Sequence, residues 1–326
     1  MSELHRFLFD GQPVRGVLVR LTDSWREVLA RRKDGDAFDA PVRHLLGEMA
    51  AAGVLMQANI KFNGTLILQI FGDGPVKVAV SEVSSDLGFR TTAKVVGETA
   101  ASDTGILPLG EMVNRHGQGR CAVTLDPEDR MPGQQPYQGV VPLNGDDGEP
   151  LSRLADVLEH YMAKSEQLET KLVLAANDEI AAGLLIQRLP LEGEANLAGE
   201  GQRDQAEADE DYNRIAVLAA SLKREELLNL DADTILHRLF WEEKLIRFEP
   251  HQGAVGPKFE CTCSRERVSN MLRGLGREEI DDIMAEQGRI DVGCDFCGAR
   301  YQFDVVDVNE LFAEGPDHPP GSSNLQ

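Results

Sequence analysis

The sequence predicts an α+β fold in three parts: an N-terminal domain in which helices pack on a mainly antiparallel sheet, a helical linker, and a small C-terminal four-cysteine module. Short β-rich segments, separated by Gly, Pro and Asp clusters, alternate with amphipathic helical patterns over the first 190 residues. Four of the five cysteines lie between Cys261 and Cys297. At 326 residues, the chain is also longer than one ordinary domain.

The N-terminal domain is expected to span residues 1–190. After two β-rich segments, at 7–9 and 14–21, Asp23 or Ser24 is positioned to cap a helix, and Pro41 suits the first turn of the next one. Asn63-Gly64 stands between apolar β-formers, which predicts a hairpin with a type I′ turn within residues 60–70. Ser152 is expected to cap a later helix. Further strands are predicted at 76–83, 90–96, 121–125, 138–141, 171–175 and 180–189.

The linker is expected to span residues 191–250. Its first part, to Asp211, is Gly-rich and acidic, which predicts a solvated segment. Helical spacing resumes at 212–230 and again at 234–245. The second helix carries a bulky apolar face that must pack against another surface. This face is formed by Ile235, Leu236, Leu239, Phe240 and Trp241.

Composition disfavours several classes of partner and activity. The 55 acidic and 33 basic residues give a net charge of −22, which repels the phosphate backbone of nucleic acids and anionic membrane surfaces. No apolar run is long enough for a transmembrane helix, and the N-terminus lacks the apolar region of a secretory signal, so we expect a cytoplasmic protein. Phosphate-binding loops and the common hydrolase and metalloprotease motifs are absent from the sequence, so neither an enzyme nor ATP dependence is expected.

The four clustered cysteines form two close pairs, Cys261-Thr-Cys263 and Cys294-Asp-Phe-Cys297. In a reducing compartment, four thiolates at such spacing are typical of a tetrahedral zinc site. We therefore predict a zinc module over residues 251–313, with Ser264 capping its first helix, followed by a disordered tail at 314–326. The fifth cysteine, Cys121, lies in a predicted strand and is expected to be a small buried hydrophobe.

Several interpretations of this module remain open from spacing alone. The commonest is a permanent structural zinc site on an adaptor or binding module. A thiol oxidoreductase using Cys294 and Cys297 is disfavoured, because the motif does not open a helix after a strand. His237 and His251 are discounted as ligands because four cysteines already complete the shell. A switch is physically possible, since zinc contributes on the order of 10 kcal/mol to folding such a module, whose own core contributes only a few kcal/mol.

The cysteine motifs resemble those of a known family, the redox-regulated chaperone heat shock protein 33 (33 kDa chaperonin). Cys261-Thr-Cys-Ser-Arg-Glu-Arg-Val268 is similar to its first cysteine motif, and Gly293-Cys-Asp-Phe-Cys297 followed by Tyr301-Gln-Phe303 is similar to its second. Tyr161-Met-Ala-Lys-Ser-Glu-Gln167 with Thr170 resembles a signature of its N-terminal domain. The acidic stretch at 191–211 and the tail depart from the recognised motifs, which leaves the release properties of the linker open.

The resemblance implies an ATP-independent holdase that is inactive while reduced and zinc-bound. Oxidant with heat is then expected to join Cys294 to Cys297 and Cys261 to Cys263 as disulfides and to expel zinc. The linker would unfold, and the protein would bind unfolding client proteins under oxidative and heat stress. Similar proteins form homodimers when oxidised. The alternative remains a constitutive structural zinc-binding adaptor module.

Overall fold

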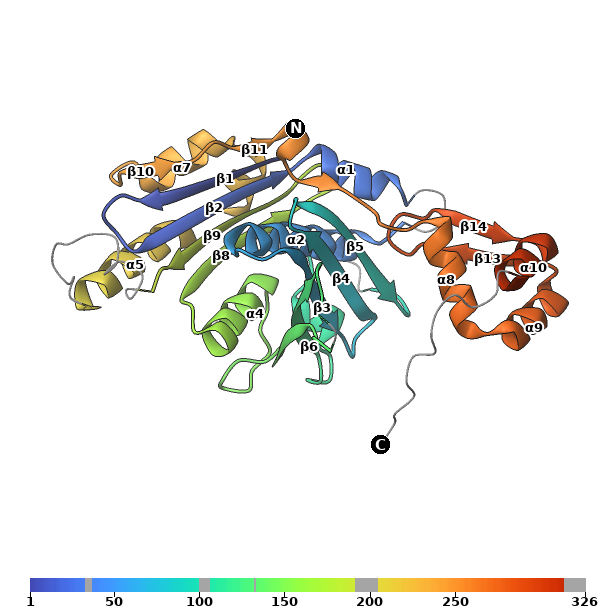
Figure 1. Cartoon of the computed structure of the whole chain (residues 1–326). Helices are drawn as coiled ribbons and strands as arrows, with labels where there is room; N and C mark the ends of the chain where they lie inside the picture. Colours follow the sequence, from blue (N-terminus) through green and yellow to red (C-terminus); the bar gives the residue numbers. More distant parts are fainter. Residues whose placement is uncertain (33–36, 100–105, 132, 191–204, 314–326) are drawn as a thin grey trace. The chain divides into compact units, whose positions relative to one another are not determined.

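The computed structural model of the chain (Figure 1) describes residues 1–32, 37–99, 106–131, 133–190 and 205–313. The chain divides into two compact units, Met1–Glu260 and Cys261–Gln326. The first unit includes the helical part of the predicted linker and also residues 251–260, which were expected to belong to the zinc module. The first part of the acidic segment, 191–204, and the tail at 314–326 lie outside the described residues.

The first sheet is antiparallel throughout and has the strand order β10-β1-β2-β9-β8, with β11 also pairing with β1. Side chains on both of its faces are buried, which explains why β9 reads as an almost continuous apolar run. Its strands are β1 (Glu3–Phe9), β2 (Val14–Leu21), β8 (Thr170–Ala176), β9 (Ala181–Arg188), β10 (Leu245–Arg247) and β11 (His251–Gln252). A short 3₁₀ turn, Gly253–Val255, follows β11.

The second sheet has the order β12-β5-β4-β3-β6-β7 and is antiparallel except for the parallel pair β12 and β5. The predicted mainly antiparallel α+β fold is confirmed, with the strands divided between two sheets. The strands of this second sheet are β3 (Gly64–Phe71), β4 (Val76–Ser84), β5 (Gly88–Val95), β6 (Arg120–Pro127), β7 (Tyr137–Pro142) and β12 (Lys258–Phe259).

Helix α2 (Ala40–Asn59) packs against strands of both sheets and is buried on most of its surface (Figure 1). Two glycines permit this close approach. A Cβ on Gly47 would lie 2.5 Å from the Cβ of Ala176 in β8, and one on Gly53 would lie 2.9 Å from a methyl of Val83 in β4. Pro41 occupies the first turn of α2, as predicted. The remaining helices of this core are α1 (Asp23–Ala30), α3 (Leu109–Val113) and α4 (Leu154–Tyr161), the last continuing as a π-helical turn, Met162–Glu166.

The hairpin predicted at Asn63-Gly64 is wrong. Helix α2 runs on to Asn59, and β3 begins only at Gly64. The glycine is required instead by close pairing, because a Cβ there would lie 2.2 Å from the carbonyl oxygen of Asp126 in β6. The predicted caps also shift by one or two residues: the N-cap of α1 is Thr22 instead of Asp23 or Ser24, and that of α4 is Arg153 instead of Ser152.

Three helices from the predicted linker pack on the first sheet, on the face opposite α2. They are α5 (Gln205–Ala220), α6 (Arg224–Asn229) and α7 (Ala232–Phe240). Residues 205–211, expected as solvated coil, are therefore the first turns of α5. The predicted apolar face of α7 is buried from Ile235 to Phe240, but Trp241 lies just beyond the helix and is 68% exposed.

The second unit is a small module with its own core. Its elements are α8 (Arg265–Leu275), α9 (Arg277–Gln287), β13 (Ile290–Gly293), β14 (Arg300–Phe303) and α10 (Val305–Ala313). The antiparallel pair β13 and β14 packs with the three helices. The buried core consists of Leu272, Ile280, Ile290, Phe303, Val308 and Leu311. Within the described residues of both units, no helix has the length and apolar character needed to cross a membrane.

Candidate metal centre

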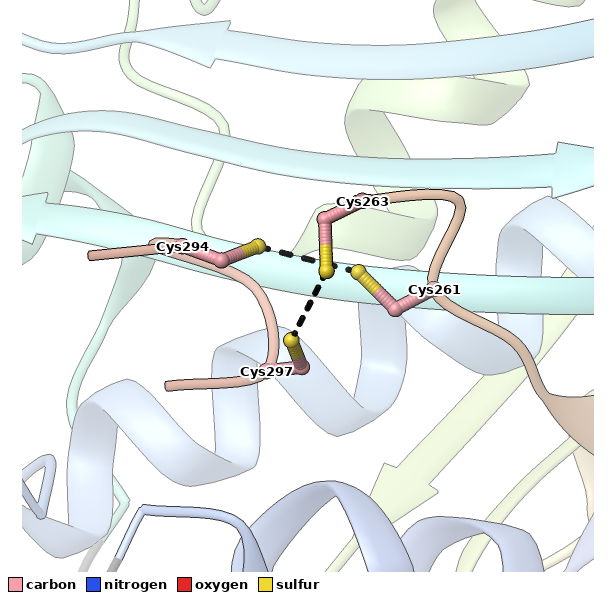
Figure 2. Close-up of side chains that lie close together, drawn as sticks. All are labelled: Cys261, Cys263, Cys294 and Cys297. Atoms are coloured by element: carbon pink, nitrogen blue, oxygen red, sulfur yellow. Dashed lines mark hydrogen bonds between the residues drawn. The ribbon is translucent and has the colours of Figure 1, made fainter. Parts of the chain in front are cut away.

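The four predicted cysteine ligands come together in the second unit (Figure 2). Their sulfur atoms all lie within 4.8 Å of one another. The Cys261 and Cys294 sulfurs are 3.7 Å apart, and the Cys263 and Cys297 sulfurs are 3.3 Å apart. These two contacts join one pair to the other across more than thirty residues of sequence. All four are free thiols at these distances.

Cys294 and Cys297 lie in a tight turn between β13 and β14. The Cys294 N–H donates to the carbonyl oxygen of Ala299 at 2.8 Å, and the Gly298 N–H donates to the carbonyl oxygen of Cys294 at 2.8 Å. Gly298 has a φ of +70°, a conformation that glycine adopts without strain. The turn thereby places both sulfurs in the four-cysteine cluster.

Cys261 and Cys263 lie immediately before α8, and the Arg-rich start of that helix fixes their segment. Ser264 caps α8 by accepting from the Arg267 N–H at 3.1 Å, as predicted. Arg265 donates to the carbonyl oxygen of Gln302 at 2.8 Å and pairs with Asp307 at 2.7 Å, while its guanidinium stacks 4.3 Å from the Phe303 ring. The first cysteine pair is thereby tied to β14, which follows the second pair.

The geometry and the donor set fit a thiolate-bound metal ion. Four sulfurs placed about 2.3 Å from a tetrahedral zinc would lie about 3.8 Å from one another. The observed separation of 3.7 Å across one edge is close to this value. Thiolates are soft ligands, and they bind zinc in preference to hard cations such as magnesium or calcium. Of the four side chains, only Cys297 is buried and the other three are half-buried, so solvent reaches part of the cluster.

Tyr301, on β14, donates its hydroxyl hydrogen bond to the Cys263 sulfur at 3.2 Å. Burial of the Cys263 thiol opposes its ionisation, but the hydrogen bonds from Tyr301 and the neighbouring thiols outweigh this and lower its pKa to about 7. The same hydrogen bond raises the pKa of Tyr301 to about 12. Burial raises the pKa of Cys297. In the sequence, Tyr301 stands out only as part of the second cysteine motif. Its position four residues after Cys297, near the start of β14, is the one local signal of this role.

The residues that we discounted as ligands lie elsewhere. Cys121 is fully buried in β6, and burial raises the pKa of its thiol to about 12, in keeping with a small hydrophobe. His251 lies on β11 of the first unit, where its Nε2 is 3.0 Å from the guanidinium of Arg6. His237 lies near the end of α7 in the same unit.

Comparison with known proteins gives one consistent result. The family model described as Hsp33 protein matches residues 2–304. The 33 kDa chaperonin of Chromobacterium violaceum is 47% identical over 311 residues, which cover 95% of this chain and 94% of that protein. The 33 kDa chaperonin of Neisseria meningitidis serogroup A is 42% identical over 95% of this chain and 91% of its own length.

A solved structure shares the fold. The crystal structure of the 33 kDa chaperonin from Thermotoga maritima superposes with a TM-score of 0.72 at 21% identity, covering 95% of this chain and 98% of that one. The relatives carry the name of a chaperone, which agrees with the expectation that the protein is not an enzyme. The chain therefore belongs to the Hsp33 family, a family of chaperones.

Proposed function

We propose that this protein is a redox-regulated, ATP-independent holdase of the cytoplasm. In the reduced state Cys261, Cys263, Cys294 and Cys297 bind zinc and the protein is inactive. Under oxidative and heat stress the four cysteines form two disulfides, the zinc is lost, the linker unfolds, and the protein binds unfolding clients as a homodimer. One observation carries the proposal: helices α5, α6 and α7 cover an apolar face of the first sheet that would otherwise be exposed.

The covered face is large and apolar on both sides. The sheet contributes residues from all four of its longer strands, among them Phe7, Phe9, Leu18, Leu184 and Ile186. The three helices and the turn between α5 and α6 contribute Tyr212, Ile215, Ala219, Leu222, Leu227, Ile235, Leu236, Leu239 and Phe240. Release of the helices would expose both sets of side chains to water. Large exposed apolar patches bind other apolar chains.

Polar contacts at α6 flank this apolar interface. Arg20, on β2, donates to the carbonyl oxygen of Leu227 at 2.7 Å, near the C-terminal end of α6. Arg224, at the start of α6, lies 3.3 Å from the Glu48 carboxylate on α2 and also donates to the carbonyl oxygen of Ala176. Because these are long side chains at the rim, they set the position of α6 and add less stability than the buried apolar contacts.

Oxidation of a cysteine pair is a two-electron reaction with peroxide. One thiolate sulfur attacks a peroxide oxygen, so that the S–O bond forms, the O–O bond breaks, and hydroxide leaves as water after protonation. The second thiolate attacks this sulfur, the S–S bond forms, and a second hydroxide leaves as water. Disulfide sulfurs no longer serve as thiolate ligands, so the metal is lost and the small core of the module cannot keep it folded.

The test is to treat the zinc-loaded protein with peroxide at elevated temperature while measuring zinc release and the aggregation of a denatured client. Zinc release together with suppressed aggregation is expected. If zinc leaves but aggregation is unchanged, the holdase proposal fails. If zinc stays bound, the switch fails, and a constitutive zinc-binding adaptor becomes the better description.

Single-cysteine variants test the order of events. Cys294→Ser removes the Cys294–Cys297 pair, which we propose closes first, since a C-x-C disulfide is the more strained of the two. An unaltered response to peroxide in this variant would refute the proposed order. Cys121→Ser is the matched control, because Cys121 is a buried cysteine outside the cluster and its loss should leave zinc release unchanged.

A further inference from the structure

The last strand before the cysteine cluster, β12, lies on the edge of the second sheet. It contains only Lys258 and Phe259, which pair in parallel with Gly88 and Phe89 of β5. The Lys258 N–H donates to the carbonyl oxygen of Leu87 at 3.2 Å, and the Glu260 N–H donates to that of Phe89 at 2.9 Å. The next residue is Cys261. The first metal ligand is therefore joined directly to a segment held on a sheet edge.

The side chains of β12 also have specific partners in the first unit. Phe259 packs against the main hydrophobic core, and the Arg31 guanidinium lies 4.9 Å from the centre of its ring. The ammonium of Lys258 lies 2.8 Å from the Asp86 carboxylate. This contact, with the hydrogen bond from Ser84, lowers the pKa of Asp86 to about 2. The edge thus offers backbone acceptors, an apolar contact and a cation for an aromatic ring, and an anion beside it.

We propose that β12 is an internal occupant of a client-binding edge, and that β5 accepts an extended segment of an unfolded client when β12 leaves. The inference rests on the proposed function, because it requires that the zinc module unfolds on oxidation. The occupant is defined by the chemistry of β12: an extended stretch with an aromatic residue, preceded by a basic residue, and with free backbone N–H groups at alternate positions.

A client segment can form a longer ladder than β12 does. Strand β5 runs from Gly88 to Val95, but β12 pairs only with its first two residues. In the part of the chain that the structure describes, no other strand pairs with β5 on this side. Each further backbone hydrogen bond contributes about 1 kcal/mol. A longer strand from an unfolded client would therefore displace the two-residue β12 once β12 is no longer attached to a folded zinc module.

The direct test is a fluorescent peptide of residues 254–260 with blocked ends, titrated into the full-length protein and followed by anisotropy. The oxidised, zinc-free protein should bind it at least about tenfold more tightly than the reduced, zinc-loaded protein, because β12 occupies the edge in the latter. Equal affinity for the two forms would overturn the inference.

Two N-methylated peptides provide a matched comparison. Methylation at Glu260 removes an N–H that donates to β5, so affinity should fall about tenfold. Methylation at Phe259 alters an N–H that points away from β5, because successive N–H groups of a strand point to opposite sides, and should change affinity far less. Equal losses for the two peptides would show that the backbone ladder is not what binds.

A variant of the protein tests release of β12 without oxidation. Phe259→Ala removes the ring that packs against the core and Arg31, so the reduced protein should bind the peptide while keeping its full zinc content. Phe248→Ala is the control, since Phe248 is 49% exposed and lies outside β12. Unchanged peptide binding by the zinc-loaded Phe259→Ala protein would contradict the inference.

Competition separates this inference from the proposed function. The peptide should displace a denatured client from the oxidised protein. If the oxidised protein suppresses aggregation but the peptide neither binds nor competes, the edge is not the client site and the holdase function stands. If the oxidised protein does not suppress aggregation at all, both proposals fail.

Discussion

The Phe240 ring of α7 meets the Phe9 ring of β1 edge to face, with centroids 5.0 Å apart and planes at 89°. Phe240 is 2% exposed and also lies 6.1 Å from Phe7. Phe240→Ala should cost about 3 to 5 kcal/mol of the free energy that holds α7 on the sheet, since it removes a buried aromatic ring and leaves a cavity. The reduced, zinc-loaded variant is therefore expected to bind an apolar dye and to suppress client aggregation without oxidant.

Trp241→Ala is the natural control for this variant, because the neighbouring aromatic side chain is even larger but mostly exposed. It should leave dye binding and aggregation near wild-type values. A Phe240→Ala protein that stays inactive until it is oxidised would show that α7 does not cover the client surface.

The contact between Glu48 and Arg224 predicts a pH dependence of stability. Burial raises the pKa of Glu48 from 4.5 to about 7, although Arg224 opposes the shift. Because the pKa of Glu48 is higher in the folded than in the unfolded protein, proton binding to this carboxyl stabilises the fold. This stabilisation is complete below pH 4.5 and is lost as pH rises through 7. The loss is about 3 kcal/mol. Glu48→Gln should remove this part of the decline in urea-unfolding free energy.

Glu225→Gln serves as the control for that measurement, since Glu225 is exposed on the same helix as Arg224. Its unfolding free energy should follow the wild-type pH profile. If the profiles of Glu48→Gln and wild type run parallel between pH 4.5 and 7, the carboxyl is not protonated as proposed.

The hydroxyl of Tyr301 supports the metal centre through Cys263. Tyr301→Phe removes the 3.2 Å hydrogen bond to the sulfur while keeping the ring on β14. Outer-shell partners of metal ligands typically contribute 10- to 100-fold in affinity, so zinc should bind about tenfold more weakly in a competition with a chromogenic chelator. Tyr137→Phe, which removes a hydroxyl that bonds Glu166 in the first unit, should not change zinc affinity.

Removal of the metal should unfold the second unit alone. Chelation is expected to make the amides of α8, α9 and α10 exchange rapidly with solvent deuterium, because the core formed by residues such as Leu272 and Phe303 is too small to persist unaided. The amides of β9, buried on both faces, should remain protected. Continued protection of α8 after chelation would show that the module folds without metal.

The cysteine site could be predicted well from the sequence because its information is local. Each pair is two or three residues apart, and the Ser264 cap lies beside one of them. The role of Tyr301 could not be predicted, because it depends on how β14 places one hydroxyl against a sulfur 38 residues away. Local spacing does not specify such a contact.

The fold was less predictable where distant segments meet. Asn63-Gly64 fits a hairpin by local preference, yet Gly64 is needed for its close approach to Asp126 on another strand. Likewise, the sequence before Cys261 carries only two residues of strand, and their partner β5 lies far away in the chain. The exposure of Trp241 follows from where α7 ends, which helical periodicity alone does not determine.

Cys121 gives the protein a built-in reference for thiol chemistry. Its side chain is fully buried in β6, and burial raises the pKa of its thiol to about 12. A thiol-reactive dye applied to the metal-free chain, whose first unit stays folded, should therefore label the four clustered cysteines and leave the fifth untouched. Labelling of Cys121 would then mark the opening of the second sheet, so a single mass spectrum can separate oxidation at the switch from damage to the chaperone core.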